Sequence, residues 1–118
     1  MPIKILVVED EAVIALDFQL RLEEIGHQVK TVSSGEMALK MIDKEDYDLV
    51  FMDLSLNGEL DGFETASAIR SKKPNIDIVF VTGSSDLSKT NINLNKDYQY
   101  LSKPIEGTEL KEIIGTYI

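Results

Sequence analysis

Short apolar segments alternate with longer segments of helical periodicity along this chain of 118 residues. The apolar segments lack the polar residue at every second position that a half-buried strand shows, so we expect strands covered on both faces. The longer segments repeat apolar residues at three- and four-residue spacing, as amphipathic helices do. Strict alternation of the two predicts an α/β fold of three layers, (βα)5, in which a five-stranded parallel sheet has helices on both faces.

The bounds of the expected elements follow from the same pattern. The expected strands are residues 3–8, 29–32, 48–52, 76–81 and 98–101. The expected helices are residues 11–25, a segment containing Ala38, Met41 and Ile42 behind a capping box of Ser33 and Glu36, residues 62–71, and residues 108–117. Residues 84–95 are rich in Ser, Thr and Asn, so any helix there should be weak. In residues 11–25 two apolar lines are visible, one of Val13, Leu16 and Leu20 and one of Phe18, Leu22 and Ile25.

Composition argues against several classes of function. The length is typical of one domain, so we expect a single domain over residues 1–118. The formal net charge of −9 argues against direct binding of nucleic acid or of an anionic membrane surface. The chain has no cysteine and no apolar stretch as long as a membrane span, and it lacks an N-terminal signal segment. We therefore expect a cytoplasmic protein. The single histidine, His27, follows a helix-ending glycine, and we expect it to be a surface loop residue without a role.

Polar residues follow four of the five expected strands. Asp53 stands in the middle of the apolar run FMDLSL (51–56), where a lone buried carboxylate would be costly. The carboxyl ends of parallel strands meet at one edge of a sheet, so Asp53 should lie near the polar residues that end the other strands. Those residues are Glu9, Asp10, Thr82 and Lys103. An aspartate just before a helix is also a good N-cap, so Asp10 can serve both purposes.

Three carboxylates at one edge require cations or protons beside them. Two carboxylates ~5 Å apart repel by roughly 3 kcal/mol at the effective dielectric constant of a protein. Oxygen ligands in this small number suit Mg²⁺, and Mg²⁺ together with the ammonium group of Lys103 would balance the three charges. Such a site suits transfer of a phosphoryl group to a carboxylate. Taken alone, Thr82 fits a β-branched strand end as well as a site residue, and Tyr100 fits an ordinary strand aromatic. A lone lysine is more often a surface residue, but the Lys-Pro pair that closes the last expected strand favours a site role for Lys103.

Five short motifs resemble those of the receiver domains of two-component response regulators, and the resemblance covers the whole chain. They are VVEDE (7–11), FMD (51–53), DGFE (61–64), VTG (81–83) and LSKP (101–104). The resemblance implies a flavodoxin-like fold with strand order 2-1-3-4-5. The loop after Asp53 departs from the family's commonest form. It is one residue longer, and Asn57-Gly58 stands where a proline is usual.

The resemblance also implies a role for each site residue. Asp53 would be the phosphoacceptor, and Lys103 would contact the phosphate. Mg²⁺ (or Mn²⁺) would be held by Glu9, Asp10, Asp53 and the backbone carbonyl of Ser55. Thr82 would be the switch hydroxyl, Tyr100 the switch aromatic, and the Lys103–Pro104 bond would be cis.

The implied function is a signalling switch within a two-component system or phosphorelay. A sensor histidine kinase or a phosphotransfer protein would give its phosphoryl group to Asp53, and the face made by the fourth helix, fifth strand and fifth helix would then change. Residues 84–95 would be the low-stability element in this change. The chain would be a phosphoacceptor domain rather than an enzyme, although it would assist its own phosphorylation and dephosphorylation. Further expected partners are an output domain or downstream protein, and a second copy of the phosphorylated chain.

Three alternatives remain at this point. A phosphatase or phosphotransferase of the dehalogenase-like class would carry a D-x-D pattern after the first strand, but Asp10 is followed by Glu11 and Ala12. A nucleotide or flavin carrier would carry a glycine-rich loop at the same place, where the chain reads EDEAVIAL. The main alternative is a receiver-like protein-interaction module that is not regulated by phosphorylation, because motifs indicate capability and not use.

Overall fold

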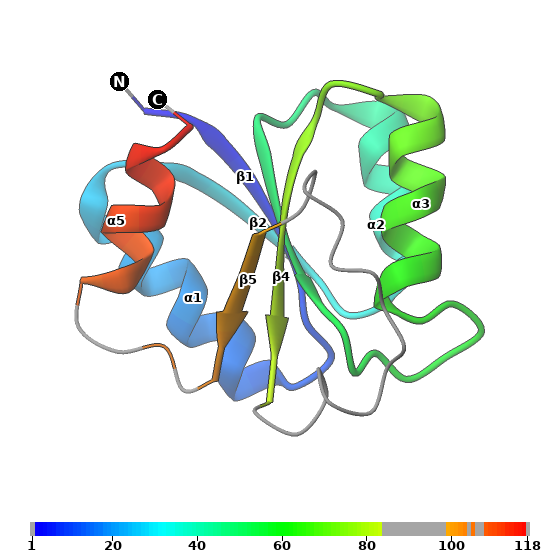
Figure 1. Cartoon of the computed structure of the whole chain (residues 1–118), viewed down its shortest axis with the longest axis horizontal. Coiled ribbons are helices and arrows are strands. Elements are labelled where there is room, and N and C mark those ends of the chain that lie inside the picture. The colour runs from blue at the N-terminus through cyan, green and yellow to red at the C-terminus, as the bar shows by residue number, and fades with distance from the viewer. Residues whose placement is uncertain (1, 84–98, 104, 106–107, 118) are drawn as a thin grey trace.

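Five parallel strands form one sheet in the computed structural model, which describes residues 2–83, 99–103, 105 and 108–117 (Figure 1). The strands are β1 (Lys4–Val8), β2 (Gln28–Val32), β3 (Leu49–Asp53), β4 (Asp77–Thr82) and β5 (Gln99–Ser102). They lie in the order β2-β1-β3-β4-β5, and each neighbouring pair is parallel. The expected α/β fold and its strand order are therefore confirmed. The weak helix expected over residues 84–95 lies outside the described residues.

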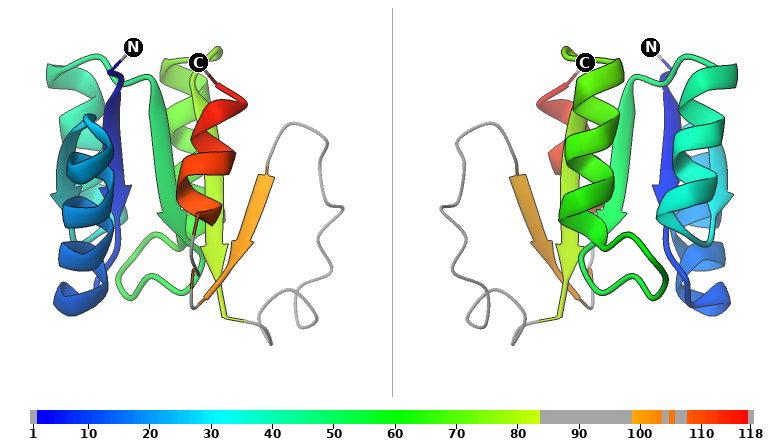
Figure 2. Two further views of the ribbon diagram at one scale, coloured as in Figure 1. Left: turned by 90° about the vertical axis from the view of Figure 1, so that its left-hand side faces the viewer. Right: turned by 90° about the vertical axis from the view of Figure 1, so that its right-hand side faces the viewer.

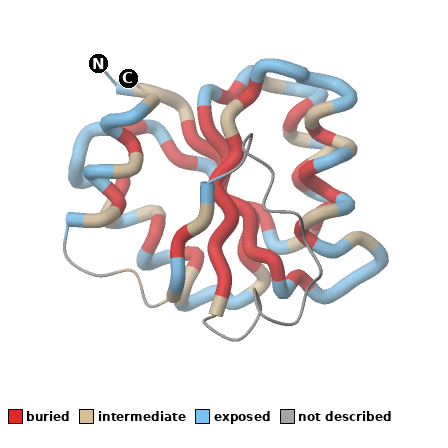
Figure 3. Tube along the Cα trace, viewed as in Figure 1, coloured by how far each residue is buried: buried red, intermediate tan, exposed pale blue. Residues whose placement is uncertain are grey.

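Two helices of the described part of the chain cover each face of the sheet. Helices α1 (Ala12–Ile25) and α5 (Glu109–Gly115) lie on one side, and α2 (Gly35–Lys44) and α3 (Gly62–Lys72) lie on the other (Figures 1 and 2). Strand β3 is buried at all of its residues (Figure 3). Its alternate side chains enter two separate cores, because successive residues of a strand point to opposite faces. An apolar run without alternation is what such a position requires.

Helix α1 buries Phe18 and Leu22 of one apolar line, whose third member, Ile25, is 38% exposed, and it leaves the other line at the surface. Phe18 and Leu22 are 4% and 0% exposed, whereas Val13, Leu16 and Leu20 are 82%, 53% and 58% exposed. A helix that lies on a sheet contacts it with one stripe, so the second apolar line faces outward. None of the helices in the described part of the chain combines the length and the apolar character needed to cross a lipid bilayer.

The helix starts differ from the sequence-based expectations at two places. Helix α2 is capped by Ser34, whose hydroxyl accepts a hydrogen bond from the Met37 N–H, so the capping box expected from Ser33 and Glu36 is wrong. Helix α1 begins after Glu11, so Asp10 lies one residue too early to be its N-cap. The complete capping box belongs to α3, whose residues Asp61 and Glu64 each accept a hydrogen bond from the other's backbone N–H. Helix starts depend on where the loop ends, which a spacing of two residue types does not specify.

His27 is buried and not a surface loop residue. Its side chain is 8% exposed, and its Nδ1 accepts a hydrogen bond of 3.1 Å from the Ile3 N–H. The segment between α1 and β2 folds back against the start of β1, where the Gln28 N–H donates to the Ile3 carbonyl. Burial lowers the pKa of His27 from its ordinary value, because desolvation disfavours the charged imidazolium. The prediction of an exposed His27 was therefore wrong, and the residue has a structural contact.

Candidate metal and phosphoryl site

The ends of β1 and β3 are neighbours in the sheet. Val8 pairs with Met52 in a parallel register, so the residues that follow them, Glu9 and Asp53, come to the same edge. Asp10 follows Glu9 directly. The structure therefore brings together the three carboxylates that the common direction of the strands predicts at this edge.

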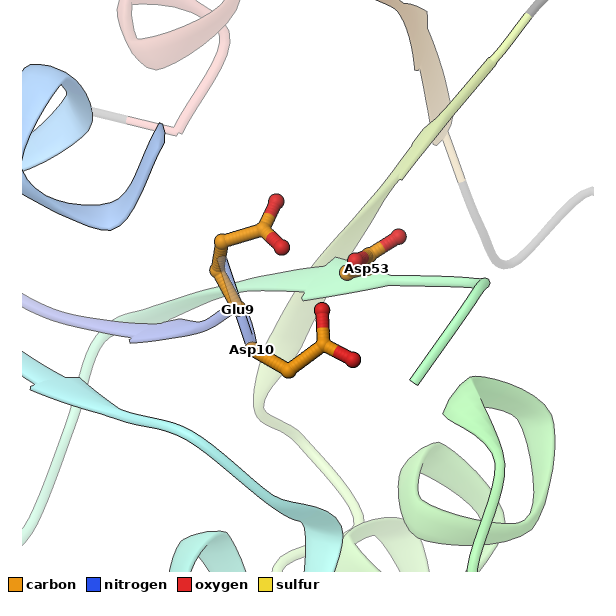
Figure 4. A group of neighbouring side chains, drawn as sticks. All are labelled: Glu9, Asp10 and Asp53. Atoms are coloured by element: carbon orange, nitrogen blue, oxygen red, sulfur yellow. The ribbon is translucent and has the colours of Figure 1, made fainter. Parts of the chain in front are cut away.

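The three carboxylate groups converge on one space. One oxygen each from Glu9, Asp10 and Asp53 lies within 4.8 Å of the others, and the side chains point toward a shared region (Figure 4). Glu9 and Asp53 are each only 3% exposed, and Asp10 is half-buried. Carboxylates so close together and so poorly hydrated repel one another unless positive charge is nearby.

Lys103, the residue directly after β5, supplies positive charge to the three acids. Its Nζ lies 2.8 Å from Glu9 Oε1 and 3.5 Å from Asp53 Oδ2. Its backbone N–H donates a hydrogen bond of 2.7 Å to the Thr82 carbonyl, which extends the pairing of β4 with β5 by one residue. The position of Lys103 is therefore set by the sheet and not by its own flexible side chain alone.

Lys103 does not neutralise all of the negative charge at the site. Burial, together with a hydrogen bond to the Asp53 side chain, raises the pKa of Glu9 to about 7, although the hydrogen bond to Lys103 acts in the opposite direction. Burial also works against the charged form of Lys103, but its hydrogen bond to Glu9 and the charge of Asp53 outweigh burial and raise its pKa. A carboxyl group that tends to hold a proton near neutral pH indicates an arrangement that can accept a further cation.

Backbone amides of the chain hold the carboxylates in place. The Glu11 N–H donates to Glu9 Oε2 at 3.1 Å, and the Ser55 N–H donates to Asp53 Oδ1 at 2.9 Å. The Asn57 N–H donates to Asp10 Oδ2 at 3.1 Å. The last of these contacts joins residues 47 positions apart, and sequence reasoning did not predict it. Only the path of the loop between β3 and α3 brings Asn57 to Asp10.

Glycine is required where α3 begins beside Asp53. A Cβ at Gly62 would collide with the backbone carbonyl of Asp53 and would also press on the Cα of Leu54. The first turn of α3 thus lies directly against the end of β3. The DGFE motif contributes both this glycine and the aspartate that caps the helix.

The remaining predicted site residues that the structure describes lie on β4, on β5 and in the turn after β3. Thr82 ends β4 and is fully buried, and its Oγ1 donates to the Gly83 carbonyl at 3.0 Å. Tyr100 pairs with Phe80 in the sheet, and the two rings stack with centroids 5.4 Å apart on the α2–α3 side. Ser55 is exposed in the turn after Asp53. Pro104, for which a cis bond is expected, lies outside the described residues.

Comparison with known proteins places these motifs in a family. A family model described as "Response regulator receiver domain" matches residues 5–115. The alkaline phosphatase synthesis transcriptional regulatory protein PhoP of Bacillus subtilis is 37% identical over 109 residues, which cover 91% of this chain and 45% of that protein. This chain spans about half the length of the transcriptional regulators that it matches.

Solved structures that match essentially the full length of the chain include two response-regulator or receiver proteins with magnesium. The response regulator TrrA of Thermotoga maritima, in complex with Mg(2+)-BeF, is 34% identical with a TM-score of 0.81, and the match covers 100% of both chains. The receiver domain of the sensor histidine kinase PA1611 of Pseudomonas aeruginosa is 26% identical with a TM-score of 0.86. That match covers 99% of this chain and 98% of the other, and a magnesium ion is coordinated in the active site cleft of the PA1611 domain.

Proposed function

Because the chain belongs to the response-regulator receiver domains of two-component signalling, we propose that Asp53 is its phosphoacceptor and that phosphorylation of Asp53 switches it between two signalling states. The observation that carries this proposal is the convergence of Glu9, Asp10 and Asp53 at one sheet edge, with the ammonium of Lys103 within 3.5 Å of Asp53. An acidic cluster without a function would not need the half-buried lysine that stands beside two of its members. A nucleophilic carboxylate beside a cation site and a lysine is the set of groups that phosphoryl transfer needs.

The donor set fits Mg²⁺, with Mn²⁺ as a substitute. The three carboxylates offer hard oxygen ligands in a number that leaves coordination positions for water or phosphoryl oxygens. Glu9, Asp10 and Asp53 would hold the ion, together with the backbone carbonyl of Ser55. When bound, the ion neutralises negative charge on the phosphoryl group during its transfer. The magnesium in the solved structures of TrrA and PA1611 supports this assignment.

Asp53 acts as the nucleophile in the proposed reaction. One of its carboxylate oxygens attacks the phosphorus of a phosphohistidine on a partner kinase or phosphotransfer protein, or of a small phosphodonor. A bond forms between the Asp53 oxygen and phosphorus, and the bond from phosphorus to the donor atom breaks, so that its electron pair leaves with the donor. Lys103 stabilises the negative charge on the phosphoryl oxygens. Attack of water on the resulting acyl phosphate reverses the modification, and the same residues assist that step.

Thr82 and Tyr100 would convert the modification into a change of surface. The new phosphoryl group attracts the Thr82 hydroxyl, and the ring of Tyr100 takes up the space that is vacated. The face formed around β5 and α5 then presents a different surface to an output domain, a downstream protein or a second copy of the chain. Two states that differ by only a few kcal/mol suffice for one phosphoryl group to shift their populations.

Intact-mass measurement tests the proposal directly. After incubation with Mg²⁺ and acetyl phosphate, the protein should gain the mass of one phosphoryl group, and the gain should be absent in EDTA. Asp53→Asn should abolish the gain. Asp46→Asn is the matched control, because Asp46 is 95% exposed and pairs with Lys73 at the surface. No gain in the wild type under these conditions, or with a phosphorylated histidine domain, would instead favour an interaction module that phosphorylation does not regulate.

A further inference from the structure

The first half of the loop between β3 and α3 is hydrogen-bonded to the acidic site. The Ser55 N–H donates to Asp53, and the Asn57 N–H donates to Asp10. Both contacts are made by backbone groups, so they depend on the path of the loop and not on the identity of its side chains. The position of this loop therefore decides how two of the three acids are oriented.

The second half of the same loop is anchored to α2 through Glu36. The Leu60 N–H donates a hydrogen bond of 3.0 Å to Glu36 Oε1, across 24 positions of sequence. Hydrogen bonds from the backbone N–H of Glu36 itself, and then from that of Leu60, lower the pKa of Glu36, so the group is a carboxylate at neutral pH. Between the two anchors stands Gly58, whose φ of +131° belongs to the region that favours glycine.

Glu36 itself has a fixed position. It lies in the first turn of α2, which Ser34 caps, and the next residue after the cap is Gly35. A Cβ at Gly35 would collide with Oγ1 of Thr65 on α3 and would press on Leu60. The first turn of α2 thus packs directly against α3 and the end of the loop. Glu36 therefore connects the Leu60 end of the loop to a helix start that packs against α3.

We propose that Glu36 is a positioning residue for the divalent-cation site, acting through the backbone of the loop 54–61. The carboxylate of Glu36 holds the Leu60 end of the loop, and the loop in turn holds Asp10, Asp53 and the Ser55 carbonyl in the arrangement that receives the ion. This inference rests on the proposed function, since it assigns a role at the same site. It gives α2 a part in the site although none of its residues lies among the three converging carboxylates.

Magnesium affinity tests the role of Glu36. We expect isothermal titration calorimetry to show that Glu36→Ala weakens Mg²⁺ binding about tenfold, as loss of a group that orients metal ligands commonly does. Glu36→Gln keeps an oxygen that can accept the Leu60 hydrogen bond, and it should weaken binding clearly less than Glu36→Ala. A second readout needs no ion. In EDTA, exchange of the Leu60 amide hydrogen should be faster in Glu36→Ala than in wild type.

A charge-matched control separates positioning from simple attraction of the cation. Glu59→Gln removes one negative charge from the exposed side of the same loop and leaves the backbone in place, so Mg²⁺ affinity should stay within about twofold at physiological salt. Equal weakening by Glu59→Gln, equal weakening by Glu36→Gln and Glu36→Ala, or unchanged binding in Glu36→Ala would each overturn the positioning role. Failure of the wild type to bind Mg²⁺ would overturn the proposed function itself, which is a different result.

Discussion

Glu9 and His27 are both titratable side chains buried at ends of the same sheet, but their surroundings differ. His27, 8% exposed, is neutral and satisfied by one backbone N–H from Ile3. Glu9, 3% exposed, faces two further carboxylates and shares one lysine with Asp53. Burial lowers the pKa of His27 and raises that of Glu9 to about 7.

The comparison shows that burial of a polar group does not by itself indicate function. At the His27 end, one hydrogen bond satisfies the group and desolvation keeps it uncharged. At the Glu9 end, the fold concentrates more negative charge than its own residues neutralise, which costs stability. Carboxyl groups with strongly shifted pKa values cluster at functional sites, where a bound cation can supply the missing positive charge. Three measurements test this distinction, starting with the largest expected effect.

Replacing Glu9 should stabilise the protein at alkaline pH in EDTA. The folded state binds the Glu9 proton more tightly than the unfolded chain, so the free energy of unfolding falls as pH rises from 4.5 to about 7. A shift of this size corresponds to a loss of about 3 kcal/mol. Glu9→Gln should remove that loss, so urea denaturation at pH 8 should show a more stable variant. The same pH slope in both proteins would mean that folding does not raise the pKa of Glu9. The contrast drawn between Glu9 and His27 would then be wrong.

Replacing Lys103 should destabilise the protein at pH 8 in EDTA. Lys103→Met removes the ammonium that lies 2.8 Å from Glu9 and 3.5 Å from Asp53. The expected loss is about 2 kcal/mol, less than for a fully buried pair because the lysine side chain is 21% exposed. Lys73→Met is the matched control. Its surface pair with Asp46 should contribute less than about 1 kcal/mol. Equal effects of the two variants in urea denaturation would mean that Lys103 does not stabilise the acidic site more than a surface lysine stabilises its partner.

Replacing His27 should change only the acid side of the stability profile. Protonation of His27 is less favourable in the folded state, so the unfolded chain binds more protons below pH 6.5 and stability is lost as pH falls. The slope from one such group is at most about 1.4 kcal/mol per pH unit. His27→Asn keeps an acceptor near the Ile3 N–H and should remove this slope. A changed Mg²⁺ affinity in this variant would contradict the purely structural role given to His27.

Most of the fold and the three acids could be predicted from sequence because both depend on local patterns. Apolar runs without alternation define strands buried on both faces, and parallel strands bring their last residues to one edge. The two apolar lines of α1 show where this reasoning stops. Leu16 and Leu22 have the same character, yet one is 53% exposed and the other 0%. Periodicity shows that a helix has apolar faces, but only packing decides which face meets the sheet.

The contacts around the site required the tertiary structure for the same reason. Asn57 reaches Asp10 and Leu60 reaches Glu36 through backbone N–H groups, which every residue except proline possesses and which therefore leave no trace in residue type. His27 was misjudged because a residue after a helix-ending glycine can turn outward or, as here, fold back onto β1.

By itself, the sequence determined the succession of strands and helices along the chain and the chemistry at the strand ends. Both can be read from apolar periodicity and side-chain type within a few neighbouring residues. The three-dimensional fold alone decided that Lys103 lies closer to Glu9 than to Asp53, which loop amides hold the acids, and that Glu36 reaches that loop. Those features depend on distances between segments far apart in the chain, and such distances are set by packing.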